Sequence, residues 1–126
     1  MTAGLASAHA HGLLNLFRGT NYTAPAGVFV KLHTGDPGAS GTANASAVTT
    51  RNEATWAAPA GGAMALSSLT GYSMTATETI SHISLWDAAT AGSFLQSAAL
   101  TTPKSVNDGD TLTLTTLTLS YTPIAA

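Results

Sequence analysis

Hydrophobic and polar positions follow two periods along this chain, and the period changes near residue 27. Between residues 3 and 18, apolar positions recur about every 3.6 residues, which predicts an N-terminal helix. The residues near one face of that helix are Leu5, His9, Leu13, Leu16 and Phe17. Gly19 follows directly after Arg18, which is a common place for a helix to end. We therefore expect a helical segment over residues 1–18 and a connector over residues 19–27.

From residue 28 onward the pattern alternates, which predicts strands. The first strand covers residues 28–33, where Val28, Val30 and Leu32 occupy alternate positions. Further strands are expected at residues 51–56, 63–69, 78–86, 94–100 and 111–121. Short strands separated by turns predict a mainly β chain, with a single antiparallel, jelly-roll-like β-sandwich over residues 28–126 after one N-terminal α-helix.

Two strands carry finer predictions about which side chains face the core. Within residues 78–86, we expect Ile83 and Leu85 on one face, and the other face would carry Ile80, His82 and Trp86. The last strand changes its alternation between Leu114 and Leu117, which are three positions apart. A bulge at that point would keep the leucines on both sides of it facing the core. A switch of the chain from one sheet to another is the alternative.

The segment at residues 34–50 is expected to be a long loop of small and polar residues. Its start, Asp36-Pro37-Gly38, has turn chemistry: proline fixes φ, glycine permits positive φ, and the aspartate side chain bonds to the turn backbone. The rest of the loop offers little apolar area to offset the entropy of ordering it. We therefore expect contact with a neighbouring chain to order this loop.

The composition excludes some functions and favours others. Only 8% of the residues are charged, so small uncharged side chains must cover most of the surface, which suits permanent packing against other proteins. With four Lys and Arg residues and a net charge of −2, the chain offers no basic stripe for nucleic acid. No stretch approaches the roughly 18 apolar residues that would indicate a membrane span, and no targeting segment is visible.

The candidate chemistry is sparse. His33, Asp36 and His82 would bind a metal or perform acid–base chemistry if they converged. We favour instead a turn in which His33 hydrogen-bonds within the loop. Asp108-Gly109-Asp110 resembles part of a calcium loop but lacks the remaining acidic ligands, so a turn is favoured there too. No nucleophile elbow or phosphate loop occurs. We predict no catalytic residues, no metal and no cofactor.

The aromatic residues suggest a further partner. Trp56, Trp86, Tyr22 and Tyr72 would line a sugar-binding surface if they gathered on one face. Trp86 follows an apolar strand, so we expect it in the core or at an interface. Trp56 lies beside a Gly/Pro turn and is the better candidate for exposure. A host-surface glycan is therefore a candidate partner.

Four segments in order carry a resemblance to a known family. They are Leu32-His33-Thr34 with Asp36-Pro37-Gly38, residues 80–90, residues 100–104 and residues 109–112. In this series the chain resembles small structural proteins of tailed bacteriophages, usually labelled tail-fibre or minor virion proteins. The resemblance covers most of residues 13–120 and matches least over residues 43–74.

The resemblance implies a non-enzymatic structural protein of the virion, assembled in the host cytoplasm. A tail-fibre-associated or minor tail protein is the first interpretation, a capsid decoration protein the alternative, and a receptor- or carbohydrate-binding module the second alternative. It further implies partners among other virion proteins and a homotrimer. From its own residues, the helix would be an attachment element, because the pairs Leu13-Leu14 and Leu16-Phe17 supply apolar side chains on more than one side, more than a helix with one buried stripe needs. The interface candidates are Leu13, Leu14, Leu16, Phe17, His33, Asp36, Pro37, Gly38 and Trp56.

Overall fold

The computed structural model describes residues 3–120; Tyr121, the expected last residue of the final strand, lies outside this range. The described helix and strands are α1 (Ser7–Phe17), β1 (Val28–His33), β2 (Asn52–Trp56), β3 (Ala63–Leu69), β4 (Tyr72–Ser73), β5 (Glu78–Trp86), β6 (Phe94–Val106), β7 (Thr111–Leu112) and β8 (Thr118–Ser120). The predicted fold class, a mainly β chain with one N-terminal helix, is confirmed.

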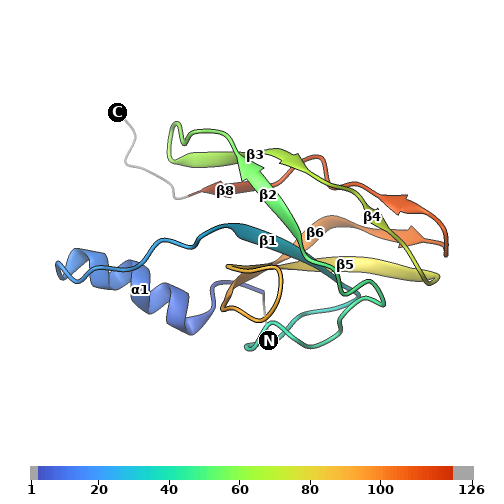
Figure 1. Ribbon diagram of the computed structural model, residues 1–126, viewed down its shortest axis with the longest axis horizontal. Coiled ribbons are helices and arrows are strands. Elements are labelled where there is room, and N and C mark those ends of the chain that lie inside the picture. The colour runs from blue at the N-terminus through green and yellow to red at the C-terminus, as the bar shows by residue number, and fades with distance from the viewer. Residues whose placement is uncertain (1–2, 121–126) are drawn as a thin grey trace.

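One curled antiparallel sheet forms most of the fold. Its strand order is β6-β5-β1-β2-β3-β8, and β4 and β7 form a separate pair. Figure 1 shows β2 crossing from the layer of β1, β5 and β6 to the layer that holds β3 and β8. The two layers face each other as in a sandwich, so the apolar sides of the strands are enclosed between them.

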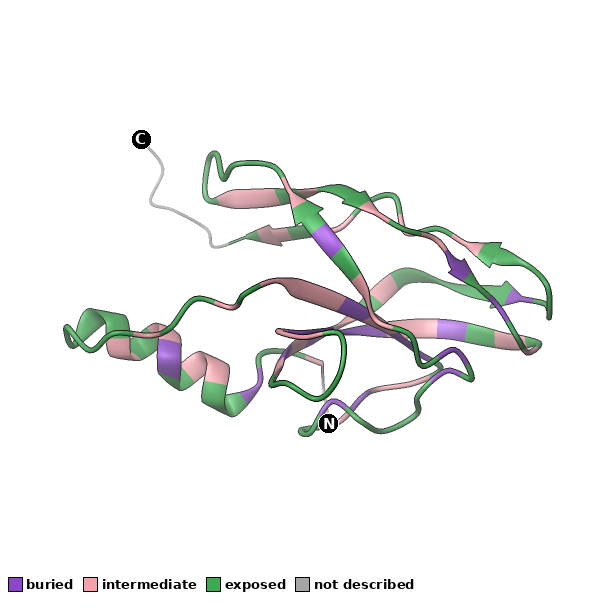
Figure 2. Ribbon diagram, in the orientation of Figure 1, coloured by how far each residue is buried: buried purple, intermediate pink, exposed green. Residues whose placement is uncertain are grey.

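The core lies between these layers, where the predicted alternation of β1 is confirmed. Val30 and Leu32 are 0% and 1% exposed. The buried Tyr72 on β4 donates its hydroxyl to the backbone oxygen of Val30 at 2.5 Å, which ties the two layers together. Burial raises the pKa of Tyr72 to about 12. Figure 2 shows the buried residues gathered in the sheet, with few on α1.

The prediction that Ile80 faces away from Ile83 and Leu85 is wrong. All three side chains belong to one core cluster. Their positions differ in parity, but the pairing of β5 with β6 shifts between Ile80, which pairs with Lys104, and His82, which pairs with Ala99. An irregularity of this kind re-aims side chains locally, so a strict alternation along the strand does not hold across it.

The change of alternation near Leu114 and Leu117 marks a sheet switch. β7 pairs with β4, whereas β8 pairs with β3 in the main sheet, so a single strand with a bulge is wrong. The leucines on both sides of the switch nevertheless pack against the core; they are Leu112, Leu114, Leu117 and Leu119. The chain thus keeps its apolar side inward while it changes strand partners.

The helix is shorter than predicted, because residues 4–6 are extended. The backbone N–H of Ala6 donates to the oxygen of Leu95, and that of Ser97 donates to the oxygen of Gly4, each at 2.8 Å. These bonds satisfy part of the edge strand β6, which would otherwise expose unpaired backbone groups. Leu5 therefore lies before α1 and not on its face.

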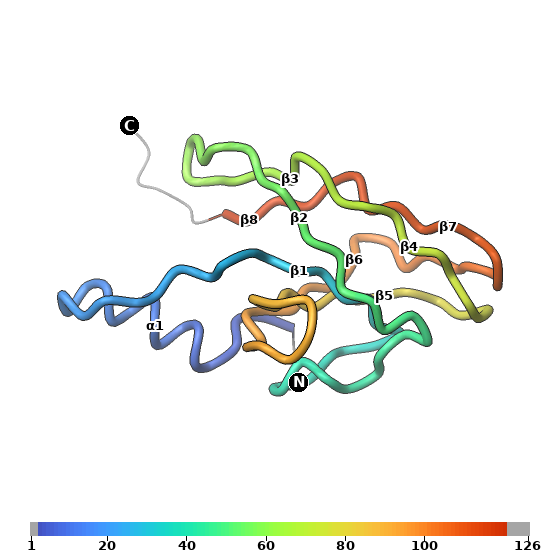
Figure 3. The backbone as a smooth tube through the Cα atoms, viewed as in Figure 1, coloured from blue at the N-terminus to red at the C-terminus, as the bar shows by residue number. Residues whose placement is uncertain are grey.

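The helix is attached to the rest of the chain through one side only. Gly12 is the buried residue of α1. A Cβ at Gly12 would lie 2.5 Å from the Tyr22 ring, so only glycine lets the helix approach this ring. The Nδ1 atom of His9 is 2.6 Å from the Tyr22 hydroxyl. Figure 3 shows the connector running back beside α1 toward β1.

Candidate interaction surface

The loop at residues 34–50 forms an additional layer on the sheet. It lies on the side of β1 and β5 that faces away from β3 and β8 (Figure 1). The N–H of Thr34 donates to the oxygen of Asn44 at 2.8 Å, and the N–H of Ser46 donates to that of Leu32 at 3.1 Å. Val48, near the end of the loop, is 8% exposed. The premise that this loop lacks burial of its own is wrong, because its own chain anchors it.

His33 is the centre of the anchor and is 0% exposed. Its Nδ1 atom is 2.8 Å from the oxygen of Ala43, so Nδ1 carries a proton and donates it. Its Nε2 atom is 2.7 Å from Ser84 Oγ and therefore accepts the serine proton in the neutral ring. Trp86 Nε1 donates to the same Ser84 oxygen at 2.8 Å. The neutral form of His33 satisfies every group in this network.

The surroundings of His33 favour that neutral form. Burial is the largest cause that lowers the pKa of His33, and the positive charges of Lys31 and His82 act in the same direction. The Ala43 carbonyl opposes them because it stabilises a protonated ring. Since both ring nitrogens are already bonded inside the protein, His33 does not touch a partner directly.

The predicted turn chemistry at Asp36-Pro37-Gly38 is confirmed. Asp36 Oδ1 accepts the N–H of Gly38 at 2.8 Å. Gly38 has a φ of +73°, a conformation that glycine adopts without strain. Asn44 donates its side-chain amide to the backbone oxygen of Asp36 at 2.9 Å. Pro37 is buried, whereas Asp36 and Gly38 are half-buried. The turn is therefore fixed from within.

Glu78 fixes the other end of the loop, a role that the sequence did not indicate. Its carboxylate accepts the Ser46 hydroxyl and, at 3.3 Å, the backbone N–H of Ala47. Asp87 likewise accepts the N–H of Ser93 at 2.6 Å. Across residues 3–120, no three His, Asp or Glu side chains gather where they would hold a metal ion. Each of these two carboxylates thus holds local backbone in place.

The four aromatic residues considered for a sugar surface do not gather on one face. Trp86 and Tyr72 are buried, and Trp56 is half-buried against the core. The Arg51 guanidinium lies 3.8 Å from the centre of the Trp86 ring, so a cation covers this aromatic face. Tyr22 is engaged by His9 on the helix. The exposure expected for Trp56 is therefore only partial.

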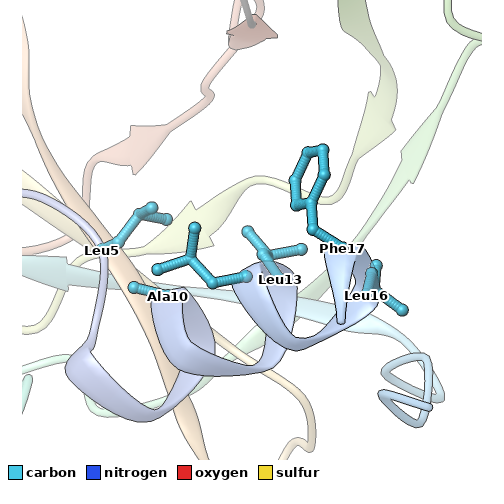
Figure 4. A pocket seen from close by; sticks show the side chains of 6 residues that line it. Leu5, Ala10, Leu13, Leu16 and Phe17 are labelled. Atoms are coloured by element: carbon cyan, nitrogen blue, oxygen red, sulfur yellow. The ribbon is translucent and has the colours of Figure 1, made fainter. Parts of the chain in front are cut away.

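The four helix candidates do come together on one open face. Figure 4 shows an apolar groove along α1, and its lining consists of Leu5, Ala10, Leu13, Leu14, Leu16 and Phe17. Leu14 is 62% exposed, Leu16 is 53% exposed and Phe17 is 91% exposed. No residue of α1 is charged in the sequence Ser7–Phe17. An exposed apolar face of this kind marks an interaction site more often than a chance surface.

Two comparisons with known proteins bear on the family of the chain. The family model for the podophage GP4 fiber I protein gp80 matches residues 4–122. The match includes all four segments on which the resemblance to tailed-phage structural proteins rested, and it confirms that resemblance. No curated protein matches the chain. In the described part of the chain, no helix is long and apolar enough to cross a membrane.

Proposed function

The chain belongs to the family of the podophage GP4 fiber I protein gp80, and from this premise we propose that it is a small oligomeric subunit associated with the tail fibre. It is a structural protein of the phage-fibre type and a component of the virion. In the proposed role it performs no catalysis and binds copies of itself and other virion proteins.

The exposed apolar face of α1 carries this proposal. A helix that is attached through Gly12 and still exposes Leu14, Leu16 and Phe17 leaves apolar area that the protomer does not cover. Burying such area in a contact is favourable, and no charged side chain of the helix would lose water in the process. The face therefore suits a permanent contact, which is what a virion subunit requires.

The remaining interface candidates support the proposal in a different way. His33 and Pro37 are buried, so their role is to set the shape of the loop surface that Asp36 and Gly38 partly expose. The half-buried Trp56 offers only part of its ring to a partner. We place the main contact at Leu13, Leu14, Leu16 and Phe17, and the expected assembly is a homotrimer.

Light scattering of the purified full chain tests the self-association. Wild-type protein is expected as a trimer, and Phe17→Ser is expected to shift the equilibrium toward monomer. Ala8→Ser changes an exposed residue on another side of α1 and serves as the matched control. A wild-type monomer at high micromolar concentration would contradict the oligomeric part of the proposal.

Immuno-electron microscopy of phage particles tests the location. An antibody against the chain should label the fibre, and labelling of the capsid instead would overturn the fibre assignment. Point variants are preferable to deletion of residues 1–18 in such work. The deletion would also remove residues 4–6 from the edge of β6, so loss of the helix and exposure of a sheet edge would be confounded.

A further inference from the structure

The curled sheet leaves a seam between its two layers on the outer side of β6. Residues 4–6 cover the edge of β6 as far as Ser97. Among residues 3–120, no strand pairs with this edge beyond that point, because β6 is the last strand of its sheet. In the opposite layer (Figure 3), residues 113–117 lie between β7 and β8 and belong to neither strand. Two segments therefore border the seam without regular strand pairing.

A groove of about 330 Å³ opens along this seam, and we call it the seam groove. Its walls come from residues 100–104 of β6 and from residues 112–116. Its deepest part reaches two buried core residues, Leu32 and Ile80. The leucines of the walls are only half-buried; they are Leu100, Leu112 and Leu114. The seam groove thus offers a ligand contact with apolar side chains that the protein covers only in part.

The rim of the seam groove is polar and carries one charge. Five threonines lie along it, and all of them are exposed. Among the described residues that line the groove, Lys104 is the one with a charge, and it is exposed at the end of the β6 wall. An ammonium group attracts an anion, whereas the leucines favour hydrocarbon. The combination fits an amphiphile that has one apolar chain and one negative head group.

The backbone of β6 argues against an added β-strand as the occupant. Ile80 pairs with Lys104 and His82 pairs with Ala99, so β6 uses five positions where β5 uses two. Pro103 lies within this irregular stretch and has no N–H to donate. A proline and a lysine on an edge strand hinder pairing with another chain. A hydrocarbon chain needs no hydrogen bonds, so the irregular backbone does not disfavour it.

We propose that the seam groove binds a single-chain carboxylate, with its hydrocarbon against Leu100, Leu112 and Leu114 and its carboxylate beside Lys104. The β6 wall from Leu100 to Lys104 is at most about 13 Å long at roughly 3.3 Å per residue, which is close to the length of an extended decanoate ion. Each methylene that leaves water stabilises the complex. This inference depends neither on the proposed self-association nor on the location in the fibre.

Titration of the full chain with decanoate, followed by NMR of the leucine methyl groups, tests the site. Saturable shifts are expected at Leu100, Leu112 and Leu114. Leu14 and Leu16 on the exposed face of α1 report the competing apolar surface and should shift much less. Shortening the chain to octanoate should weaken binding by up to about fourfold per methylene removed. Shifts confined to α1, or shifts in the groove that do not saturate, would overturn the inference.

Variation of the head group separates the role of Lys104 from that of the leucines. Lys104→Gln should weaken the binding of decanoate by up to about fivefold, the upper range for an exposed ion pair, and should leave the binding of neutral decanol unchanged. Lys31→Gln alters the other lysine of the chain, which lies on β1 outside the groove, and is the matched control. An equal loss in the two lysine variants, or equal affinity for decanoate and decyltrimethylammonium, would contradict the carboxylate site at Lys104.

Blocking the groove gives an independent test of its position. Thr101→Phe places a ring at the exposed rim and leaves the core residues unchanged, whereas Thr75→Phe makes the same change at an exposed position outside the lining. Both variants should unfold at a temperature close to that of the wild type. Added decanoate should raise the unfolding temperature of the wild type and of Thr75→Phe, but not that of Thr101→Phe. If Thr101→Phe binds decanoate as the wild type does, the ligand does not occupy the seam groove and the inference is wrong.

Discussion

Helix α1 and the loop at residues 34–50 were both predicted to contact partners, but the protein holds the loop by its own contacts and leaves the apolar face of the helix exposed. The loop is polar and long, but His33, Glu78 and Ser84 bind or support it from inside the protein. The helix is regular and short, but it exposes Leu14 and Phe17 to solvent. The need for a partner follows from uncovered apolar area and not from the length of a loop.

The difference has a physical origin in the kind of group that each segment must satisfy. A loop carries backbone donors and acceptors, and its own turns can pair them, as the N–H of Ala43 does with the oxygen of Pro37 at 2.9 Å. A helix already pairs its backbone internally. Only its side chains therefore remain to be covered. In α1, the side that packs against the rest of the chain is the side of Gly12.

The largest effect on stability is expected at the centre of the loop anchor. His33→Ala removes a fully buried ring and leaves the Ala43 oxygen and the Ser84 hydroxyl without this partner. We expect a loss of about 3 kcal/mol in the free energy of unfolding, from the cavity and the unmet hydrogen bonds together. Urea unfolding measures it. A loss below about 1 kcal/mol, within the range of ordinary surface substitutions, would show that the loop layer is not held through His33.

The far end of the loop should give the next largest effect. Glu78→Ala removes the carboxylate that accepts the Ser46 hydroxyl and the Ala47 N–H, and we expect a cost of about 1–2 kcal/mol. Glu53→Ala is the matched control, because Glu53 is an exposed carboxylate on strand β2, which β1 separates from the Glu78 strand β5. Equal changes in the two variants would show that the Glu78 contacts contribute nothing specific.

Much of the fold was accessible from the sequence, because local patterns determine it. The strands β1, β3 and β5 and the turn at Asp36-Pro37-Gly38 were predicted from alternation and turn chemistry over a few neighbouring residues. The open helix face followed from the same kind of pattern. Features that depend only on nearby positions can be predicted before the fold is known.

The anchoring of the loop was missed because its partners are distant in the sequence. His33 and Ser84 are 51 positions apart, and Ser46 and Glu78 are 32 positions apart. The sheet switch after β7 similarly depends on which strands the chain meets in space. One signal was available: Ser84 and Trp86 share a face of β5, and a polar residue beside a large aromatic there indicates that this face is covered as well.

Lowering the pH should reduce the free energy of unfolding through His33, the centre of the loop anchor. Burial lowers the pKa of His33, so below about pH 6.5 the unfolded chain takes up a proton before the folded one does. The contribution of His33 to stability is therefore fully present above that pH. It falls as the pH decreases, by at most about 1.4 kcal/mol per pH unit for this group. The pKa of His9 is lowered too and adds to the slope.

Comparison of wild type with His33→Gln isolates the contribution of His33. Urea unfolding between pH 5 and pH 8 should give a shallower pH dependence in the variant, whatever its stability at pH 8. Identical slopes in the two proteins would mean that His33 does not titrate differently on folding, and the neutral network assigned to it would be wrong.

A smaller loss is expected at the start of the loop. Asp36→Ala removes the acceptor of the Gly38 N–H and should cost about 0.5–2 kcal/mol, by analogy with the caps of helices. The hydrogen bond from the Asn44 side-chain amide to the backbone oxygen of Asp36 does not depend on the Asp36 side chain, so part of the turn should persist. The substitution should accelerate amide exchange more at Gly38 than at Ser46. An equal acceleration over the whole loop would contradict this local role.

The smallest effect on protomer stability is expected where the effect on assembly is largest. Phe17 is 91% exposed, so Phe17→Ser removes almost no contact within the protomer and should change its free energy of unfolding by less than about 0.5 kcal/mol. The measurement must be made at a concentration low enough to keep the wild type dissociated, since assembly would otherwise add to its apparent stability. At high concentration the same variant should fail to assemble, while His33→Gln, if folded, should still do so. A Phe17→Ser protomer destabilised by more than about 1 kcal/mol when dissociated would place this residue in the protomer's own packing, and the contrast between α1 and the loop would then be lost.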